Sequence, residues 1–182
     1  QFTLTANTGV AGYTGNPKAD PALLEWPNAP SGGRAAPGTG TLDGSTPGDL
    51  SFATAASAAN GNGASGSFTY DEVGYFRFKP YGVYDDTFVE ASGDKANGDC
   101  LAGSFSNAPS GGKYGCNFGN AAVTGHFGRF IHDHFDTAVM QACAAGAFTY
   151  SGQPFPLTVT AKNLQGGTTQ NYSSDSFARN VT

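Results

Sequence analysis

Short segments in which apolar and polar residues alternate recur along the chain. In the opening "QFTLTAN", Phe2 and Leu4 alternate with threonines, and "GSFTYDEVGYFRFKPYG" at 66–82 holds two such runs on either side of a turn, "DEVG". A period of two indicates β-strands with one buried face. Residues 20–27, "DPALLEWP", are the one short helix candidate, with Asp20 as its cap.

The opening pattern recurs near the other end of the sequence. "FTLTANTGVAGYTGN" at 2–16 aligns without a gap with "LTVTAKNLQGGTTQN" at 157–171, and chance agreement between common residues is the alternative to a true repeat. A repeat predicts one unit followed by the opening strands of a second copy, which starts at "GAFTYSGQPFPL". The first copy lacks this stretch, so we expect a vacancy in its sheet, filled by "FTYSGQPFPLTVTA" of its own chain or of a neighbour.

Together these patterns predict an all-β fold. We expect an immunoglobulin-like β-sandwich with long loops at 1–130, a linker at 131–146 and the opening strands of a second sandwich repeat at 147–182. The string "DEVGYFRF" is similar to the E–F corner of an immunoglobulin-like sandwich, with Phe78 where antibody domains place a cysteine. An ordinary hairpin is the alternative interpretation of this string.

The composition narrows the class of protein. Charged residues make up 13% of the 182 residues, about half the usual share, and there are 27 Gly and 10 Pro, which is typical of extracellular β-proteins. The net charge of −5 and the scattered Lys and Arg argue against a nucleic-acid partner. No apolar run reaches the roughly 18–20 residues of a membrane span. The sequence starts at Gln1 with no signal peptide or initiating Met, so we expect a processed or excised piece.

The cysteines indicate the compartment. Cys100 and Cys116 flank a loop rich in Gly, Ser and Asn that has little to bury, and closing it by a disulfide would stabilise the fold by roughly 3 kcal/mol. Their spacing does not suit a zinc site. We therefore predict a disulfide between them and an oxidising compartment. Cys143 is left over, either as a buried thiol or as the partner of a cysteine outside this sequence.

Two segments carry candidate metal ligands. The acidic segment at 84–99 suits Ca²⁺, although it lacks the regular ligand spacing of an EF-hand, and a solvated acidic loop is the alternative. In "HFGRFIHDHFD", His132 and His134 would face the same side of an extended segment and could bind a metal together with Asp136. Surface histidines in a linker are the alternative for this second segment. The expected calcium ligands are Asp94, Asn97 and Asp99.

Motifs of common enzyme classes are absent from the sequence. It has no Gly-x-Ser-x-Gly elbow, no phosphate-binding glycine loop and no His-Glu-x-x-His, so we expect no enzyme and no cofactor apart from calcium. Exposed aromatic side chains could instead stack on sugar rings in a carbohydrate-binding module. The expected stacking residues are Trp26, Tyr75, Tyr81 and Tyr84.

Strings from about residue 66 to residue 182 give the chain a family resemblance. In order they are "YDEVGYFRF", "YDDTFV", "GDCLAGSFSN", "GKYGCNFGN", "GRFIHDHFD" and "FTYSGQPFPLTVTAKNLQGGTTQNYS". The set resembles large bacterial surface proteins of MSHA-type type IV pilus biogenesis, the MshQ-like family. The resemblance implies a Gram-negative exported protein with repeated β-sandwich domains, and the paired cysteines match those of the family. His132 stands where the family is expected to carry Pro, a departure that would loosen a rigid linker.

These inferences lead to two expected functions. The first is a structural or adhesive β-sandwich module of an exported, pilus-associated cell-surface protein that assembles by strand addition. Its expected partners are other domains or copies of the parent surface protein, or pilus components, at the outer membrane or outside the cell. The alternative is a lectin-like carbohydrate-binding module that uses the exposed aromatics, with glycans as partners and calcium assisting. Glycan binding would distinguish the two.

Overall fold

The structure, a computed structural model, is all-β, as the sequence predicts. It describes residues 1–7, 13, 15–27, 39–52, 63–86 and 100–172. Helical segments in these ranges include the 3₁₀ turns η1 (Pro21–Leu23) and η4 (Ala144–Gly146), and no helix there has the length and apolar character needed to cross a membrane. The strands are β1 (Phe2–Ala6), β2 (Lys18–Ala19), β3 (Leu24–Glu25), β4 (Leu42–Gly44), β5 (Ala64–Tyr70), β6 (Gly74–Phe78), β7 (Val83–Asp85), β8 (Phe118–Gly119), β9 (Phe127–Phe130), β10 (His134–Val139) and β11 (Leu157–Lys162).

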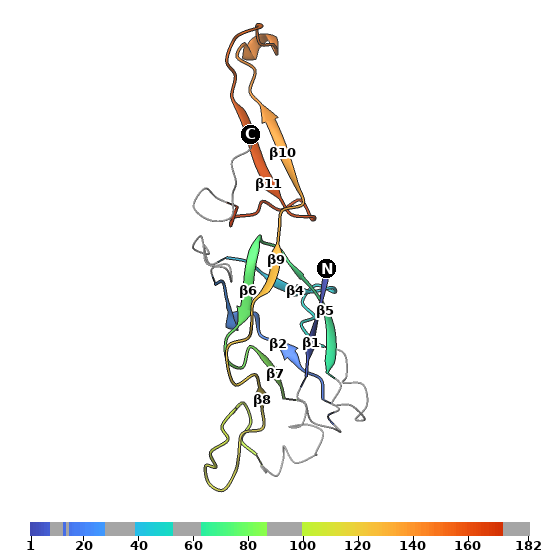
Figure 1. The fold of residues 1–182 in the computed structure, drawn as a ribbon, viewed down its shortest axis with the longest axis vertical. Helices are drawn as coiled ribbons and strands as arrows, with labels where there is room; N and C mark the ends of the chain where they lie inside the picture. Colours follow the sequence, from blue (N-terminus) through green and yellow to red (C-terminus); the bar gives the residue numbers. More distant parts are fainter. Residues whose placement is uncertain (8–12, 14, 28–38, 53–62, 87–99, 173–182) are drawn as a thin grey trace.

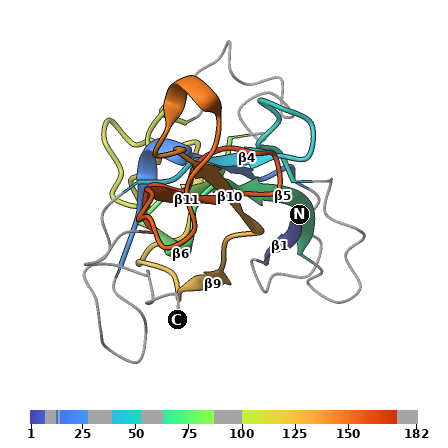
Figure 2. The same ribbon diagram turned by 90° about the horizontal axis from the view of Figure 1, so that it is seen from above.

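The strands form a body and a projecting hairpin (Figure 1). Three three-stranded sheets make up the body, in the orders β1-β5-β4, β3-β6-β9 and β2-β7-β8, and a two-stranded sheet joins β10 to β11. All of these strand pairs are antiparallel. Figure 2 looks down onto the hairpin, with the body strands behind it. The molecule is elongated because the hairpin extends away from the body instead of lying against one of its sheets.

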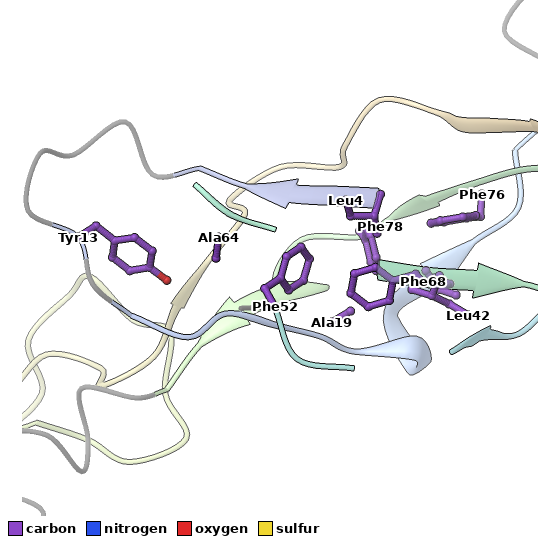
Figure 3. Packing of buried hydrophobic residues seen from close by; sticks show 10 residues of the cluster. Leu4, Tyr13, Ala19, Leu42, Phe52, Ala64, Phe68, Phe76 and Phe78 are labelled. Carbon is purple, nitrogen blue, oxygen red and sulfur yellow. The ribbon is translucent and has the colours of Figure 1, made fainter. Parts of the chain in front are cut away.

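The core of the body lies between the sheets that contain β5 and β6. Alternate residues of β6, and of β5 as far as Phe68, are buried, which confirms the period of two. Phe68 contacts Phe52 with ring centroids 5.1 Å apart, and Phe76 stacks on Phe127 of β9 at 5.3 Å. Burying one such side chain is worth about 1.5–3 kcal/mol, so this cluster supplies the main stabilisation of the body. Its buried members, most of them drawn in Figure 3, are Leu4, Tyr13, Ala19, Leu24, Leu42, Phe52, Ala64, Phe68, Phe76 and Phe78.

The helix expected at 20–27 is a single 3₁₀ turn. Asp20 caps it as predicted, because its Oδ1 accepts a hydrogen bond of 2.9 Å from the N–H of Ala22. The chain then becomes extended in β3, where Leu24 lies opposite Phe78 of β6. The expected helix is therefore wrong beyond Leu23, because pairing with β6 buries Leu24 in the core and outweighs local propensity.

A disulfide joins Cys100 to Cys116, the pair selected from the sequence. The bridge closes a loop whose backbone is also tied by a hydrogen bond of 3.0 Å from the N–H of Cys116 to the carbonyl of Leu101. The loop has more to pack than its composition indicates, because the ring of Phe105 stacks on Tyr81 with centroids 4.3 Å apart. The disulfide therefore holds an aromatic contact against the body. Cys143 takes part in no disulfide and is partly buried.

The segment expected to be a linker contains a strand. β10 lies within 131–146 and pairs along its whole length with β11, from His134 opposite Lys162 to Val139 opposite Leu157. The expectation that the tail fills a vacancy in the sheet of its own body is wrong, because β11 pairs with β10 and with no body strand among the described residues. The alternative, that it adds to a neighbour, stays a prediction. The division into domains at 130 and 146 stays a prediction.

Candidate functional site

The β10–β11 hairpin has two chemically different faces. Successive residues of a strand point to opposite sides, so directly opposite residues of an antiparallel pair share a face. The first face, called the apolar face here, carries Phe135, Thr137 and Val139 of β10 opposite Ala161, Val159 and Leu157 of β11. The second, the polar face, carries His134, Asp136 and Ala138 opposite Lys162, Thr160 and Thr158. Such an amphipathic pair is typical of a sheet that covers a core on one side.

The part of the apolar face nearest the hairpin tip is exposed. The side chains of Leu157 and Val159 are 56% and 44% exposed, and that of Val139 is 51% exposed. Contiguous apolar surface of this kind marks sites of interaction in soluble proteins. The tip adds further exposed apolar residues: Met140, Phe148, Tyr150 and Phe155.

The polar face carries an ion pair and contacts between a histidine and carboxylates. Asp136 lies 3.9 Å from Lys162 Nζ and 3.7 Å from His134 Nε2, and Nδ1 of the same histidine lies 2.8 Å from the carboxylate of Asp133. Exposed pairs of this kind each contribute about 0–1 kcal/mol. These charged and polar groups are well solvated, so the polar face is suited to contact with water and the apolar face is not.

The base of the apolar face is partly covered, although Phe135 is still 37% exposed. The ring of Phe135 lies 4.4 Å from that of His132 and 5.7 Å from that of Tyr172, and Ala161 is buried beside them. This small aromatic cluster covers the end of the hairpin nearest the body. The exposed part of the face therefore begins above a supported base.

A buried carboxylate joins the hairpin to the body. Glu72, in the turn before β6, accepts hydrogen bonds from the backbone N–H groups of Gln170 (2.6 Å) and Asn171 (3.0 Å). The side-chain amide of Asn171, only 2% exposed, donates to the carbonyls of Thr39 and Val73 at 2.9 and 3.2 Å. Hydrogen bonds to an ionised carboxylate are roughly twice as strong as neutral ones. The hairpin is therefore held in a defined position on the body.

A cavity of about 490 Å³ lies between the ends of β1, β7 and β8. Its walls combine aromatic, aliphatic and polar residues, and among them Tyr13 donates a hydrogen bond of 2.6 Å to Asp85, which is 1% exposed. Burial, this hydrogen bond and the charge of Asp85 raise the pKa of Tyr13 above its ordinary value. Apolar walls with a few fixed polar groups are the usual composition of a small-molecule site.

The four aromatic residues expected to bind sugars do not form one surface. Tyr81 and Tyr84 both contact Phe105 of the disulfide loop, and Tyr84 also lines the cavity. Tyr75 contacts His126 from β6, and Trp26 packs against the core. Of the four, Tyr81 alone is in the exposed class, at 37%. The other three are partly buried, and a role of any of the four in sugar binding stays a prediction.

The expected metal ligands are placed as follows. Asp94, Asn97 and Asp99 lie outside the described residues. His134 and Asp136 approach each other, but the ring of His132 packs on Phe135 and Tyr172. In the described ranges, no three His, Cys, Asp or Glu side chains come close enough together to hold a metal ion.

Comparison with known proteins finds a family model that matches the C-terminal part of the chain. Residues 102–182 match the family model described as DUF6701, third domain. The matched segment contains β8 to β11, and thus the whole hairpin and both of its faces. A search of curated proteins and a search of solved structures each found no match.

Proposed function

We propose that the chain is a structural or adhesive β-sandwich module of an exported, pilus-associated cell-surface protein of the MSHA-type, MshQ-like family, and that it assembles by strand addition. The observation that carries this proposal is the exposed apolar face of the β10–β11 hairpin. An amphipathic two-stranded sheet is marginally stable alone in water and gains stability when a second layer covers its apolar side.

Two further observations support the location and the class. The Cys100–Cys116 disulfide favours an oxidising compartment outside the cytoplasm. The match of residues 102–182 to a DUF6701 third domain agrees with a modular protein in which domains of this kind adjoin others. The Glu72 joint favours a structural role, because a fixed hairpin presents its face to a neighbour in one orientation.

Two matched variants of the parent protein, expressed in its own bacterium, test this function. Val159→Lys places a charge on the apolar face, and Thr158→Lys places the same charge on the exposed polar face one residue away. We expect immunolabelling of intact cells to detect the parent protein at the surface, and Val159→Lys to reduce its assembled, surface-retained fraction several-fold while Thr158→Lys leaves it unchanged. Protein confined to the cytoplasm, or equal behaviour of the two variants, would contradict the proposal.

The cavity favours a second candidate function, a carbohydrate-binding module. The aromatic side chains among its walls, Tyr84 included, together with the polar groups beside them, suit a sugar site. A glycan array followed by titration calorimetry would test it. Binding with mM to μM affinity that Tyr84→Ala abolishes would support a lectin-like role, and the absence of binding across the array would remove it.

A further inference from the structure

The two halves of the internal repeat form strands at matching positions. β1 starts at Phe2 and β11 at Leu157, the first residues of the two aligned segments. Leu4 in β1 corresponds to Val159 in β11. Each strand is paired on one edge with a described strand, β1 with β5 and β11 with β10. The aligned residues show whether β1 and β11 use corresponding edges for these pairings.

Hydrogen bonds show which edge of β1 faces β5. In an antiparallel ladder the backbone N–H and C=O of one residue point to the same edge, and the next residue points to the other edge. The carbonyl of Ser67 in β5 accepts from Ser45 at the β4 side, so the even-numbered residues of β5 point towards β1. Their partners in register are Phe2, Leu4 and Ala6. β1 therefore uses its even-numbered residues to bind β5.

The edge of β11 that faces β10 is the opposite one. The carbonyl of Pro156, directly before β11, accepts from Met140 after β10, so the even-numbered residues of this segment point towards β10. The carbonyl of Ala161 points the other way and accepts from Thr169. The odd-numbered residues Leu157 and Val159, which correspond to Phe2 and Leu4, therefore point to the outer edge of β11, where no described strand lies.

The side chains agree with the backbone. Leu4 is 6% exposed in the core and Phe2 contacts Phe68, whereas their counterparts Val159 and Leu157 are exposed. On the other side of β1, Thr5 forms a hydroxyl contact of 3.0 Å with Ser65 of β5. Thr160 is the counterpart of Thr5. The hairpin thus has an edge and a face that match those by which β1 binds β5.

We propose that the outer edge of β11 pairs antiparallel with an extended strand of the β5 type, donated by a further domain of the same repeat class. This strand places a small residue opposite Val159 and an aromatic residue opposite Leu157, in the pattern of Gly66 and Phe68. It ends before Ala161, whose outer carbonyl already accepts a hydrogen bond from Thr169. The inference rests on the proposed function, since it names the partner of the same hairpin.

The β5 strand of the same chain is not this partner. It is the central strand of its sheet, with β1 on one edge and β4 on the other. A second copy of the chain has the same arrangement, and would have to lose its own β1 to accept β11. A domain whose β5-type strand has a free edge meets no such competition, and this is why it is the favoured occupant.

A fusion tests the inference in the full chain. The sequence "GASGSFTY" of residues 63–70 is attached after Thr182 through a Gly/Ser linker of about 20 residues, whose r.m.s. span is about 25 Å. Such a tether supplies an effective concentration in the mM range. Amide hydrogen exchange is then followed by NMR at Leu157 and Val159 on the outer edge, and at Thr158 and Thr160 on the edge paired with β10.

We expect the attached strand to slow exchange at Leu157 and Val159 at least tenfold and to leave Thr158 and Thr160 unchanged. Two controls remove an N–H from the new ladder: Val159→Pro in β11, or Gly66→Pro in the attached copy. Each should return Leu157 to its exchange rate in the unfused chain. In β11 the substitution falls on the outer edge, where no described strand pairs with Val159 and where proline is tolerated.

Three results would overturn the inference. One is unchanged exchange at Leu157 and Val159 in the fusion, and another is protection that survives both proline controls. The third is concentration-dependent protection in the unfused chain, which would assign the edge to a second copy. If any of these occurs while Val159→Lys still reduces surface assembly, the proposed function stands and the β5-type partner alone is wrong.

Discussion

β1 and β11 share a sequence pattern but have opposite surroundings. In β1, Leu4 is buried between sheets, while in β11 its counterpart Val159 is 44% exposed on a hairpin. The pattern of alternating residues is therefore enough to form a strand with two unlike faces. Whether the apolar face is buried depends on a second layer, which the body supplies for β1 and the described residues do not supply for the tip of the hairpin.

The same comparison explains why the hairpin holds its shape. Its base is packed by Phe135 and Tyr172, and Glu72 fixes the chain that follows β11 to the body. A two-stranded sheet without such support is at best marginally stable in water. The body thus stabilises the hairpin from one end and leaves its apolar face available.

Alanine substitution at the matched positions 4 and 159 should give the largest difference in stability between the two regions. Leu4→Ala removes a buried side chain and is expected to lower the free energy of unfolding by about 2–5 kcal/mol. Val159→Ala, at the corresponding exposed position, should change it by less than about 0.5 kcal/mol. Chemical denaturation of both variants measures the difference. Equal losses would mean that the hairpin face is buried in the isolated chain.

Removal of the disulfide should affect the body and spare the hairpin. Replacing Cys100 and Cys116 by Ser is expected to cost about 3 kcal/mol, mainly because the unfolded chain gains freedom. It should also release Phe105 from Tyr81, whereas the ion pairs of the polar face stay in place. Denaturation and NMR shifts of the two regions test this. Chemical-shift changes in the hairpin as large as those in the disulfide loop would show that the two regions are not independent.

Loss of the Glu72 hydrogen bonds should lower the free energy of unfolding less than loss of a core side chain, but it should release the hairpin from its position on the body. Glu72→Ala leaves the N–H groups of Gln170 and Asn171 without their acceptor, which should cost about 1–3 kcal/mol. Glu72→Gln retains one of the two acceptor oxygens and should cost less than the alanine variant. Limited proteolysis within 140–156 is expected to be faster in the alanine variant. Identical cleavage of wild type and both variants would show that Glu72 does not hold the hairpin.

Alkaline pH should produce the smallest change in stability, and this change arises in the body, where Tyr13 lies. Because the folded-state pKa of Tyr13 is raised, the folded chain keeps a proton that the unfolded chain releases near the ordinary pKa of 10.0. The stability contributed by this proton is present below that pH and is lost as pH rises above it. Denaturation midpoints between pH 8 and 11 should fall less steeply in Tyr13→Phe than in wild type. Parallel slopes would contradict this.

Local pattern explains what the sequence predicts correctly. The alternation around Phe76 and Phe78 predicts two buried positions, and both are fully buried. The Cys100–Cys116 pair follows from loop composition and spacing. Strand β10 was detectable by the same means, since Phe135 and Val139 alternate with polar residues. The linker expected at 131–146 followed from the repeat boundaries, and it contains this strand.

Long-range contacts explain what the sequence does not predict. Glu72 and Asn171 lie far apart along the chain. Nothing in the local sequence indicates that the carboxylate of Glu72, in a turn, accepts a hydrogen bond from the backbone N–H of Asn171, which follows the hairpin. The exposure of aromatic side chains is likewise a property of packing, as Tyr84 shows, which contacts Phe105 and is only partly exposed. Such features depend on contacts between distant segments. The period of apolar residues and the secondary-structure propensity of a segment do not contain this information.

Thiol labelling at the matched positions of the two strands tests the central claim most directly. Leu4→Cys and Val159→Cys are each made in a Cys143→Ser background and reacted with a thiol reagent under native conditions. We predict that the cysteine at 159 reacts at the rate of a free surface thiol and at least about 100-fold faster than the cysteine at 4, because the latter is exposed only by opening of the core. Equal rates at the two positions would contradict the account.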